Sequence, residues 1–307
     1  MSLPINLNNT PHGVTLYSSN TPPHTIPLTL HSYYAQRHRL FSKFDSGIYM
    51  TPSSWFEVTP EAIAAKIGQK VLAPFQAGEA VVLDAFCGIG GNTIQFALHP
   101  GCKRVIALDT DPNAIWCARR NCQRYGVGSK VVFLEMSFFD WVEREVGVAR
   151  ESGKEREGGS GGREEVDVVF CSPPWGGPDY RSLKVFDVEK MKPYGFRVVW
   201  EGAMKALKSP PAFFMPRTSN LNQFAGYIDK LNPAAGSGSK GKGKEKELGA
   251  TVTAEAIHYT LSGKSKAVCL YVDIPITAPV LGGNEDTDDA DKVDWEGVDV
   301  DVRMSDE

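Results

Sequence analysis

Four short apolar runs constrain the fold of this chain more than any other feature of its 307 residues. They are nearly uninterrupted and rich in β-branched residues: AVVLD at 80–84, RVIALD at 104–109, KVVFLE at 130–135 and VDVVFC at 166–171. Such runs are typical of parallel strands that are buried on both faces of a sheet. Helical segments at 91–98 and 112–125 separate the first three, and Asp111 and Pro112 suit the start of the second helix.

The rest of the chain extends this alternation. PAFFM at 211–215 predicts a fifth strand, followed by a helix near 220–231. Residues 252–260 and 266–273 alternate apolar and polar side chains, which indicates an antiparallel hairpin that closes the sheet edge. The sequence therefore predicts an α/β, Rossmann-like fold: a doubly wound sheet with a C-terminal antiparallel hairpin and a helical N-terminal extension.

Three stretches mix Gly, Ser or Pro with charges and carry too few large apolar residues to form a core. We expect the following organisation: a flexible lead-in at 1–30, a helical N-terminal segment at 31–75, a catalytic-type α/β domain at 76–280 with flexible inserts at 147–165 and 235–248, and an acidic disordered tail at 281–307.

Charge is distributed unevenly along the chain. The formal net charge is −4, but Glu285–Glu307 alone carries −9, which leaves the preceding residues at +5. So mild a positive charge suits a short anionic ligand better than a long duplex. No run approaches the roughly 18 apolar residues of a membrane helix, and residues 1–30 hold no Lys or Arg, so neither a membrane span nor a secretory signal is expected.

The six cysteines show no CxxC pair, and no histidine pair has zinc-ligand spacing. Several cysteines lie inside apolar runs. We expect small buried thiols in a reducing compartment and no metal site.

A glycine loop joins the first predicted strand to the first helix. The strand ends at Asp84, and Gly88, Gly90 and Asn92-Thr93 follow, so the loop lacks the third glycine of a dinucleotide fingerprint. Asp109 ends the second strand, 21 residues beyond Gly88, where a carboxylate can accept both hydroxyls of a ribose. Asp84 can accept hydrogen bonds from an ammonium group. A ligand with an amino-acid end and a ribose but no pyrophosphate fits, and S-adenosyl-L-methionine, which leaves as S-adenosyl-L-homocysteine, is such a ligand.

The fourth strand runs into Ser172-Pro173-Pro174-Trp175, at the ligand-binding end of the sheet. This sequence resembles the Asn/Asp/Ser-Pro-Pro-aromatic motif of methyltransferases that act on exocyclic amines of bases. An aryl amine is a weak nucleophile because its lone pair is delocalised. The Ser172 oxygen and the Pro173 carbonyl can each accept one N–H, so that the lone pair faces the methyl donor, while Trp175 stacks on the base.

Longer stretches carry a more specific resemblance: YAQRHRLFSKFDSGI at 34–48, WFEVTPEAIA at 55–64, LDAFCGIGGNTIQFA at 83–97, ALDTDP at 107–112, VFCSPPWGGPDY at 169–180 and FFMPR at 213–217. In these stretches the chain resembles the trimethylguanosine synthase family, which methylates N2 of the 7-methylguanosine cap of small nuclear and nucleolar RNAs.

The resemblance implies cofactor contacts by Phe44, Thr59, Asp84, Asp109 and Asn121, guanine contacts by Ser172 and Trp175, and cap-phosphate contacts by Tyr180 and Arg217. It also implies a nuclear or nucleolar protein, with some in the cytoplasm, that has ribonucleoprotein partners. The family carries an acidic residue after the third strand, where this chain has Ser137, a weaker acceptor for the adenine amine. The full set of predicted cofactor residues is Phe44, Thr59, Asp84, Phe86, Cys87, Gly88, Gly90, Asn92, Thr93, Asp109, Asn121 and Ser137.

Two alternatives stay open at this point. The Ser-Pro-Pro-Trp motif alone does not name the base, so an amino methyltransferase of internal guanine or adenine in ribosomal or transfer RNA also fits. The Ser137 departure leaves room for a cap-binding module without catalytic activity. The basic residues Arg37, Arg39 and Lys43 either contact phosphates or solvate a helix face.

Overall fold

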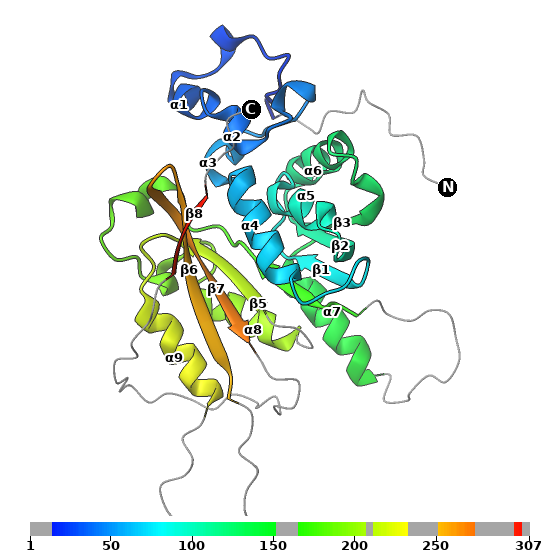
Figure 1. The fold of residues 1–307 in the computed structure, drawn as a ribbon, viewed down its shortest axis with the longest axis vertical. Coiled ribbons are helices and arrows are strands. Elements are labelled where there is room, and N and C mark those ends of the chain that lie inside the picture. The colour runs from blue at the N-terminus through cyan, green and yellow to red at the C-terminus, as the bar shows by residue number, and fades with distance from the viewer. Residues whose placement is uncertain (1–13, 152–164, 207–210, 233–250, 274–297, 303–307) are drawn as a thin grey trace, which may run out of the picture. The chain divides into compact units, whose positions relative to one another are not determined.

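The computed structural model describes residues 14–151, 165–206, 211–232, 251–273 and 298–302 (Figure 1). The chain divides into two compact units, one formed by residues 1–166 with 304–307 and the other by residues 167–303. Each unit contains its own strands and its own covering helices, and we describe them in turn.

Where the structure describes the first unit, it contains three parallel strands in the order β3-β2-β1 (Figure 1). Their bounds are Ala80–Asp84 for β1, Cys102–Asp109 for β2 and Val131–Glu135 for β3. Every residue of β1 is buried, as its uninterrupted apolar run predicts. The parallel register places Asp84 and Asp109 at the same carboxyl edge of this sheet.

Helices cover these strands. They are α4 (Glu61–Leu72), α5 (Gly91–Leu98), α6 (Pro112–Arg124) and α7 (Phe138–Glu151). α5 packs against β2 and α4, and α6 packs against β2 and β3. Asp111 caps α6 as predicted, because its side chain accepts a hydrogen bond from the Asn113 amide.

An N-terminal segment of short helices precedes α4. It contains α1 (His31–Tyr34), α2 (Arg37–Leu40) and α3 (Ser54–Glu57), which confirms its predicted helical character. The prediction of a flexible lead-in is wrong for residues 14–30. Tyr17 pairs with Met50 in an antiparallel bridge, and Tyr17 and Ile26 are both buried. Apolar side chains scattered among Pro and Thr residues are enough to anchor this part of the chain.

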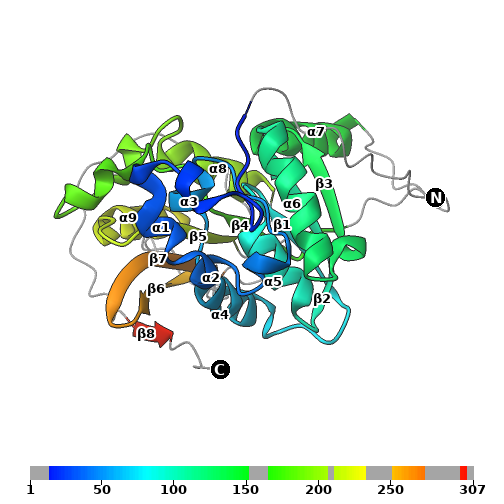
Figure 2. The ribbon, with the colours of Figure 1, turned by 90° about the horizontal axis from the view of Figure 1, so that it is seen from above.

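The described residues of the second unit form five strands in the order β4-β5-β7-β6-β8. The strands are β4 (Val168–Cys171), β5 (Pro211–Pro216), β6 (Thr253–Leu261), β7 (Lys264–Asp273) and β8 (Val298–Val302). β4 and β5 are parallel, and β6 and β7 form the predicted antiparallel hairpin (Figure 2). β7, not β6, pairs with β5, and β8 pairs in parallel with the other side of β6. The hairpin therefore does not close the sheet edge.

Aromatic side chains hold the helices of the second unit on its sheet. α8 (Phe196–Lys205) contributes Phe196 and Trp200, α9 (Leu221–Leu231) contributes Phe224, and β5 contributes Phe213. The ring centroid of Phe196 lies 5.2 Å from that of Phe213 and 4.9 Å from that of Phe224. Phe196, Phe213 and Phe224 are fully buried. Replacing one such ring by Ala costs roughly 3–5 kcal/mol of folding free energy.

Two further boundaries differ from the sequence-based predictions. Residues 147–151 of the insert predicted at 147–165 are helical, because α7 continues to Glu151. Residues 152–164 and the insert predicted at 235–248 lie outside the described residues. The tail predicted to be disordered from 281 onward contains β8. Its alternating VDVDV sequence has the two-residue period of a strand, a signal that its acidic composition concealed.

Candidate active site

The loop between β1 and α5 depends on glycine at two positions. Gly88 and Gly90 have φ angles of 51° and 92°, in the left-handed region that side chains disfavour. A Cβ on Gly90 would also lie 3.3 Å from Cα of Ala118 on α6. A Cβ on Gly88 would meet nothing within 4 Å. Gly90 therefore allows close helix packing, whereas Gly88 serves the turn of the loop itself.

Asp84 ends β1 as a buried carboxylate whose two oxygens differ in their hydrogen bonding. The Thr93 hydroxyl donates to Oδ2 over 2.6 Å, and Oδ1 accepts no hydrogen bond from the described residues. Burial raises the pKa of Asp84 to about 7, and the Thr93 hydrogen bond opposes that rise. A buried carboxyl group in this state is stabilised as an anion by any ligand that brings a positive charge.

Asn92 offers a second acceptor at the start of α5. Its Nδ2 donates to the Thr59 hydroxyl over 3.1 Å, and its buried Oδ1 has no hydrogen-bond partner among the described residues. Unpaired buried acceptors are costly and rare in folded proteins. Together with Oδ1 of Asp84, this oxygen fits a ligand that carries N–H donors.

Asp109 ends β2 with both carboxylate oxygens engaged by the backbone. Oδ2 accepts from the Gly88 amide over 2.8 Å, and Oδ1 accepts from the Asp111 amide over 2.9 Å. Burial raises the pKa of Asp109, and these two amide hydrogen bonds oppose the rise. Each oxygen keeps a further lone pair, so the carboxylate can still accept two ribose hydroxyls while it fixes the glycine loop.

Asn121 on α6 is fully buried, and its side-chain amide forms three hydrogen bonds. Its Nδ2 donates to the carbonyl oxygens of Tyr49 and Ile89, each over 3.0 Å, and its Oδ1 accepts from the Tyr49 amide over 2.9 Å. The side chain thus ties the glycine loop to the N-terminal segment. These contacts make Asn121 a positioning residue for the loop, a role that sequence reasoning did not foresee because both partners are backbone atoms.

The remaining predicted cofactor residues are placed mainly by packing and capping. Phe44 is fully buried, with its ring centroid 5.8 Å from that of Trp55. Phe86 packs on Phe138 at 5.7 Å. Burial raises the pKa of the Cys87 thiol, which makes it a poor nucleophile. Ser137 caps α7, because its hydroxyl accepts from the Phe139 amide over 3.1 Å.

These groups fit S-adenosyl-L-methionine. The unpaired acceptors of Asp84 and Asn92 match its ammonium group, and the Asp109 carboxylate at the next strand end matches its ribose. The glycine turn at Gly88 leaves room for the ligand to approach the backbone. Ser137 retains its hydroxyl proton and one lone pair, which leaves it able to contact a neighbouring amine.

The second unit carries the Ser-Pro-Pro-Trp motif at the end of β4. Ser172 and Trp175 are half-buried, and Pro173 between them is buried. The indole Nε1 of Trp175 donates to the Phe214 carbonyl on β5 over 3.2 Å, and its ring lies 5.7 Å from that of Phe214. This bond fixes the plane of the indole while the ring remains partly accessible.

Tyr180 contacts this indole, and Arg217 belongs to the same unit. The Tyr180 ring meets Trp175 edge-on, with centroids 5.1 Å apart and planes at 90°. Arg217 directly follows β5 and is exposed. Tyr180 therefore lies against Trp175. Arg217 lies three residues beyond Phe214, whose carbonyl accepts the hydrogen bond from Trp175.

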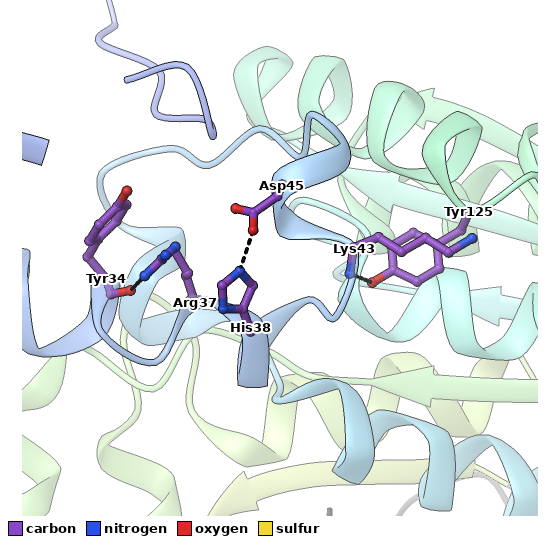
Figure 3. Close-up of polar contacts among 6 residues, drawn as sticks. All are labelled: Tyr34, Arg37, His38, Lys43, Asp45 and Tyr125. Carbon is purple, nitrogen blue, oxygen red and sulfur yellow. Dashed lines mark hydrogen bonds and ion pairs between the residues drawn. The ribbon is translucent and has the colours of Figure 1, made fainter. Parts of the chain in front are cut away.

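Arg37 and Lys43 of the N-terminal segment contact aromatic rings within the first unit (Figure 3), whereas Arg39 is exposed. The Arg37 guanidinium lies 4.5 Å from the centre of the Tyr34 ring, and the Lys43 ammonium lies 5.1 Å from that of Tyr125. His38 Nε2 lies 2.8 Å from Asp45 Oδ2. The cations of Arg37 and Lys43 therefore already rest on aromatic faces of their own unit.

Two kinds of site are absent from the parts of the chain that the structure describes. No group of three or more His, Cys, Asp or Glu side chains there could hold a metal ion. No helix there is long and apolar enough to cross a membrane. All six cysteine side chains are buried, as predicted.

Comparisons with known proteins agree with this geometry. A solved structure described as a methyltransferase from Porphyromonas gingivalis W83 has a TM-score of 0.52, covers 83% of this chain and 55% of its own, and shares 10% identity, so the likeness concerns the fold. The trimethylguanosine synthase of Schizosaccharomyces pombe is 35% identical over 207 residues, covering 67% of this chain and 77% of that protein. That of Saccharomyces cerevisiae is 38% identical over 198 residues, covering 64% of this chain and 57% of that protein.

Residues 79–274 match the model of a family described as RNA cap guanine-N2 methyltransferase. This range contains the glycine loop, both strand-end carboxylates and the Ser-Pro-Pro-Trp motif. The chain belongs to the RNA cap guanine-N2 methyltransferase family and is an S-adenosyl-L-methionine-dependent methyltransferase.

Proposed function

We propose that this protein transfers methyl groups from S-adenosyl-L-methionine to the exocyclic N2 of the 7-methylguanosine cap of RNA, which gives the 2,2,7-trimethylguanosine cap. The observation that carries the proposal is the fixed, partly accessible indole of Trp175 beside Ser172 and Pro173. N7-methylguanine is a cationic ring, and Trp offers the most electron-rich aromatic face for it. An unmethylated guanine gains less from the same contact.

In the proposed mechanism, one set of residues binds the cofactor and another binds the guanine. Asp84, Asn92 and Asp109 bind and orient the cofactor, which supplies the sulfonium methyl group. Trp175 would stack on the guanine, and the oxygens of Ser172 and Pro173 would accept N–H groups of N2, which would leave the nitrogen lone pair free to attack a methyl group. The N–methyl bond would form as the S–methyl bond of the cofactor breaks, and S-adenosyl-L-homocysteine would be the leaving group. The methylated amine is acidic enough to release its proton to water. Burial raises the pKa of the Cys87 thiol, which keeps this thiol protonated and outside the reaction.

Small nuclear and small nucleolar RNAs are the substrates we propose, with a nuclear or nucleolar location and ribonucleoprotein partners. The support is the relatedness to trimethylguanosine synthases of two yeasts. Tyr180 and Arg217 are the proposed contacts of the cap phosphates, since a planar guanidinium suits phosphate oxygens.

A product analysis tests this function. The protein is incubated with labelled cofactor and RNA that carries either a 7-methylguanosine or an unmethylated guanosine cap, and the RNA is digested to identify the methylated nucleoside. We expect label in the 7-methylguanosine cap alone. Equal label in both caps, or label at internal bases, would contradict the proposal. Cofactor binding without transfer would indicate a cap-binding module.

A further inference from the structure

We propose that an exposed strip of the second unit, Leu183-Lys184-Val185, binds the RNA nucleotides that follow the cap. The inference rests on the proposed function and extends it from the cap to the attached RNA. It concerns side chains outside the set assigned above to cofactor, guanine and cap phosphates.

The strip is unusual in its exposure. Leu183 and Val185 are 46% and 63% exposed, and they are two of the three large apolar side chains of the second unit's described residues that are exposed to this degree. Lys184 between them is also exposed and forms no ion pair with a described residue. A cation flanked by accessible apolar groups suits a flexible strand that presents phosphates, sugars and base faces in turn.

Backbone pairing places the strip beside the proposed phosphate contacts. Phe186, which directly follows the strip, forms a parallel bridge with Ser219. Its amide donates to the Thr218 carbonyl over 2.7 Å, and its carbonyl accepts from the Asn220 amide over 2.9 Å. Arg217 immediately precedes this pairing, so the end of the strip is tied to the backbone that carries Arg217.

A ring contact ties the strip to the other proposed phosphate residue. The Tyr180 ring lies 6.2 Å from the Phe186 ring and 5.1 Å from the Trp175 ring. Trp175, Tyr180 and Phe186 thus form a continuous series within one unit. An RNA whose cap base stacks on Trp175 and whose cap phosphates reach Tyr180 and Arg217 continues past the position of the strip.

Local charge favours an RNA rather than a basic protein partner. The nearest described acid that follows is Asp187, and it is already engaged: Gln223 Nε2 donates to it over 2.7 Å, and Lys190 lies 3.5 Å away. Lys184 is left as the accessible charge of the strip. A phosphate contact made by such a lysine adds affinity without base specificity.

The test compares two substrates that share the cap. One is the dinucleotide m7GpppG, and the other is a 7-methylguanosine-capped RNA of ten nucleotides. For Lys184→Ala and for Leu183→Ser/Val185→Ser we expect kcat/KM on the dinucleotide to stay within about twofold of wild type, and kcat/KM on the capped RNA to fall roughly fivefold at low salt. The salt dependence is the sharper readout, because loss of one single-strand phosphate contact lowers the slope of log affinity against log salt by about 0.7.

Lys230→Ala provides the matched control, since it removes the same charge from the last turn of α9 and should change neither substrate. Equal losses on both substrates would overturn the proposal and assign Lys184 to the cap itself. Unchanged turnover and unchanged affinity for the capped RNA, measured by fluorescence anisotropy, would overturn it in favour of a protein partner. Failure of the wild-type protein to methylate m7GpppG would contradict the proposed function instead, and anisotropy would still test RNA binding by the strip.

Discussion

The two units present their functional groups in opposite ways. In the first unit the groups proposed to meet the cofactor are buried polar atoms such as Asp84 and Asn92, which have unused hydrogen-bonding capacity. In the second unit the groups proposed to meet the RNA are a half-buried indole and an exposed guanidinium, Trp175 and Arg217. Buried acceptors discriminate strongly, because leaving them unpaired is costly, whereas accessible rings and cations tolerate variety. The comparison indicates strict cofactor selection and recognition of the RNA by shape and charge.

The largest loss of activity should come from replacing the Trp175 ring of the second unit. We expect Trp175→Ala to lower kcat/KM on m7GpppG by roughly 100-fold, since stacking of a base on an aromatic side chain contributes about 1–3 kcal/mol. Trp175→Phe should keep part of the activity, although it lacks the Nε1 hydrogen bond to Phe214. Cofactor affinity, measured by calorimetry, should be unchanged in both variants. A matching loss of cofactor affinity would contradict the assignment of base binding to the second unit and cofactor binding to the first.

A smaller effect should come from the buried carboxylate of the first unit. We expect Asp84→Asn to weaken cofactor binding roughly 30-fold at pH 8, because a hydrogen bond to a charged group contributes about 1.5–3 kcal/mol. The pKa of Asp84 is raised to about 7, so the carboxylate is lost as the pH falls below 7. Wild-type affinity should therefore fall by about tenfold per pH unit below 7. Calorimetry from pH 5.5 to 8.5 measures this, and a flat wild-type profile would contradict it.

The same carboxyl group should affect folding with the opposite dependence on pH. Its pKa in the folded protein lies above the ordinary value of 3.8, so the folded state binds the extra proton between these values. The free energy of unfolding of the protein without cofactor should decrease as the pH rises from about 4 to about 7. Asp84→Asn should remove this contribution. Urea unfolding at pH 5, 6 and 7 compares the two proteins, and identical slopes would count against the raised pKa.

Thr93 allows a finer test, since its hydroxyl opposes the raised pKa of Asp84. Thr93→Val keeps the shape of the side chain but removes the hydrogen bond. We expect the midpoint of the pH profile of cofactor binding to rise by about one unit, with little change in affinity at pH 9. A uniform loss of affinity at every pH would instead indicate a packing defect.

The smallest effect should come from the exposed cation of the second unit. Arg217→Lys keeps the positive charge but loses the planar fork, and we expect KM for capped RNA to rise roughly threefold while kcat is maintained. Arg217→Ala should have a larger effect on KM. Steady-state kinetics with the 7-methylguanosine-capped RNA of ten nucleotides measures both variants, and a fall in kcat without a change in KM would contradict a phosphate-binding role.

Much of the fold and the family was predictable from the sequence because the relevant signals are local. β1 and β4 are buried throughout, as their apolar runs predict, and the family resemblance is confirmed. The prediction of burial on both faces is wrong for β3, where Phe133 alone is buried and Val132 is 39% exposed, because β3 lies at the end of the strand order. The prediction overlooked α8, although Phe196, Val199, Trp200 and Ala203 follow a helical period and are all buried. This signal could have revealed the helix.

Other features depend on contacts distant in sequence. The hydrogen bond from Trp175 to Phe214 requires β4 and β5 to pair, and the pKa of Asp84 depends on its complete burial. Neither can be deduced from the motifs themselves. Likewise, Asn121 is assigned to the cofactor by resemblance, and its contacts with the backbone of Tyr49 and Ile89 become visible only in three dimensions.

The hydrogen bond between Trp175 and the Phe214 carbonyl also means that β5 fixes the separation between the proposed base contact and the proposed phosphate contact. Phe214 holds the ring proposed to receive the base, and Arg217, three residues further along the same chain, is the proposed phosphate contact. The spacing between these two points is set by a buried strand and cannot readily adapt. A cap analogue with one phosphate fewer should therefore contact the Trp175 ring but not reach the Arg217 guanidinium. The protein should thus select the number of cap phosphates as well as the cap base.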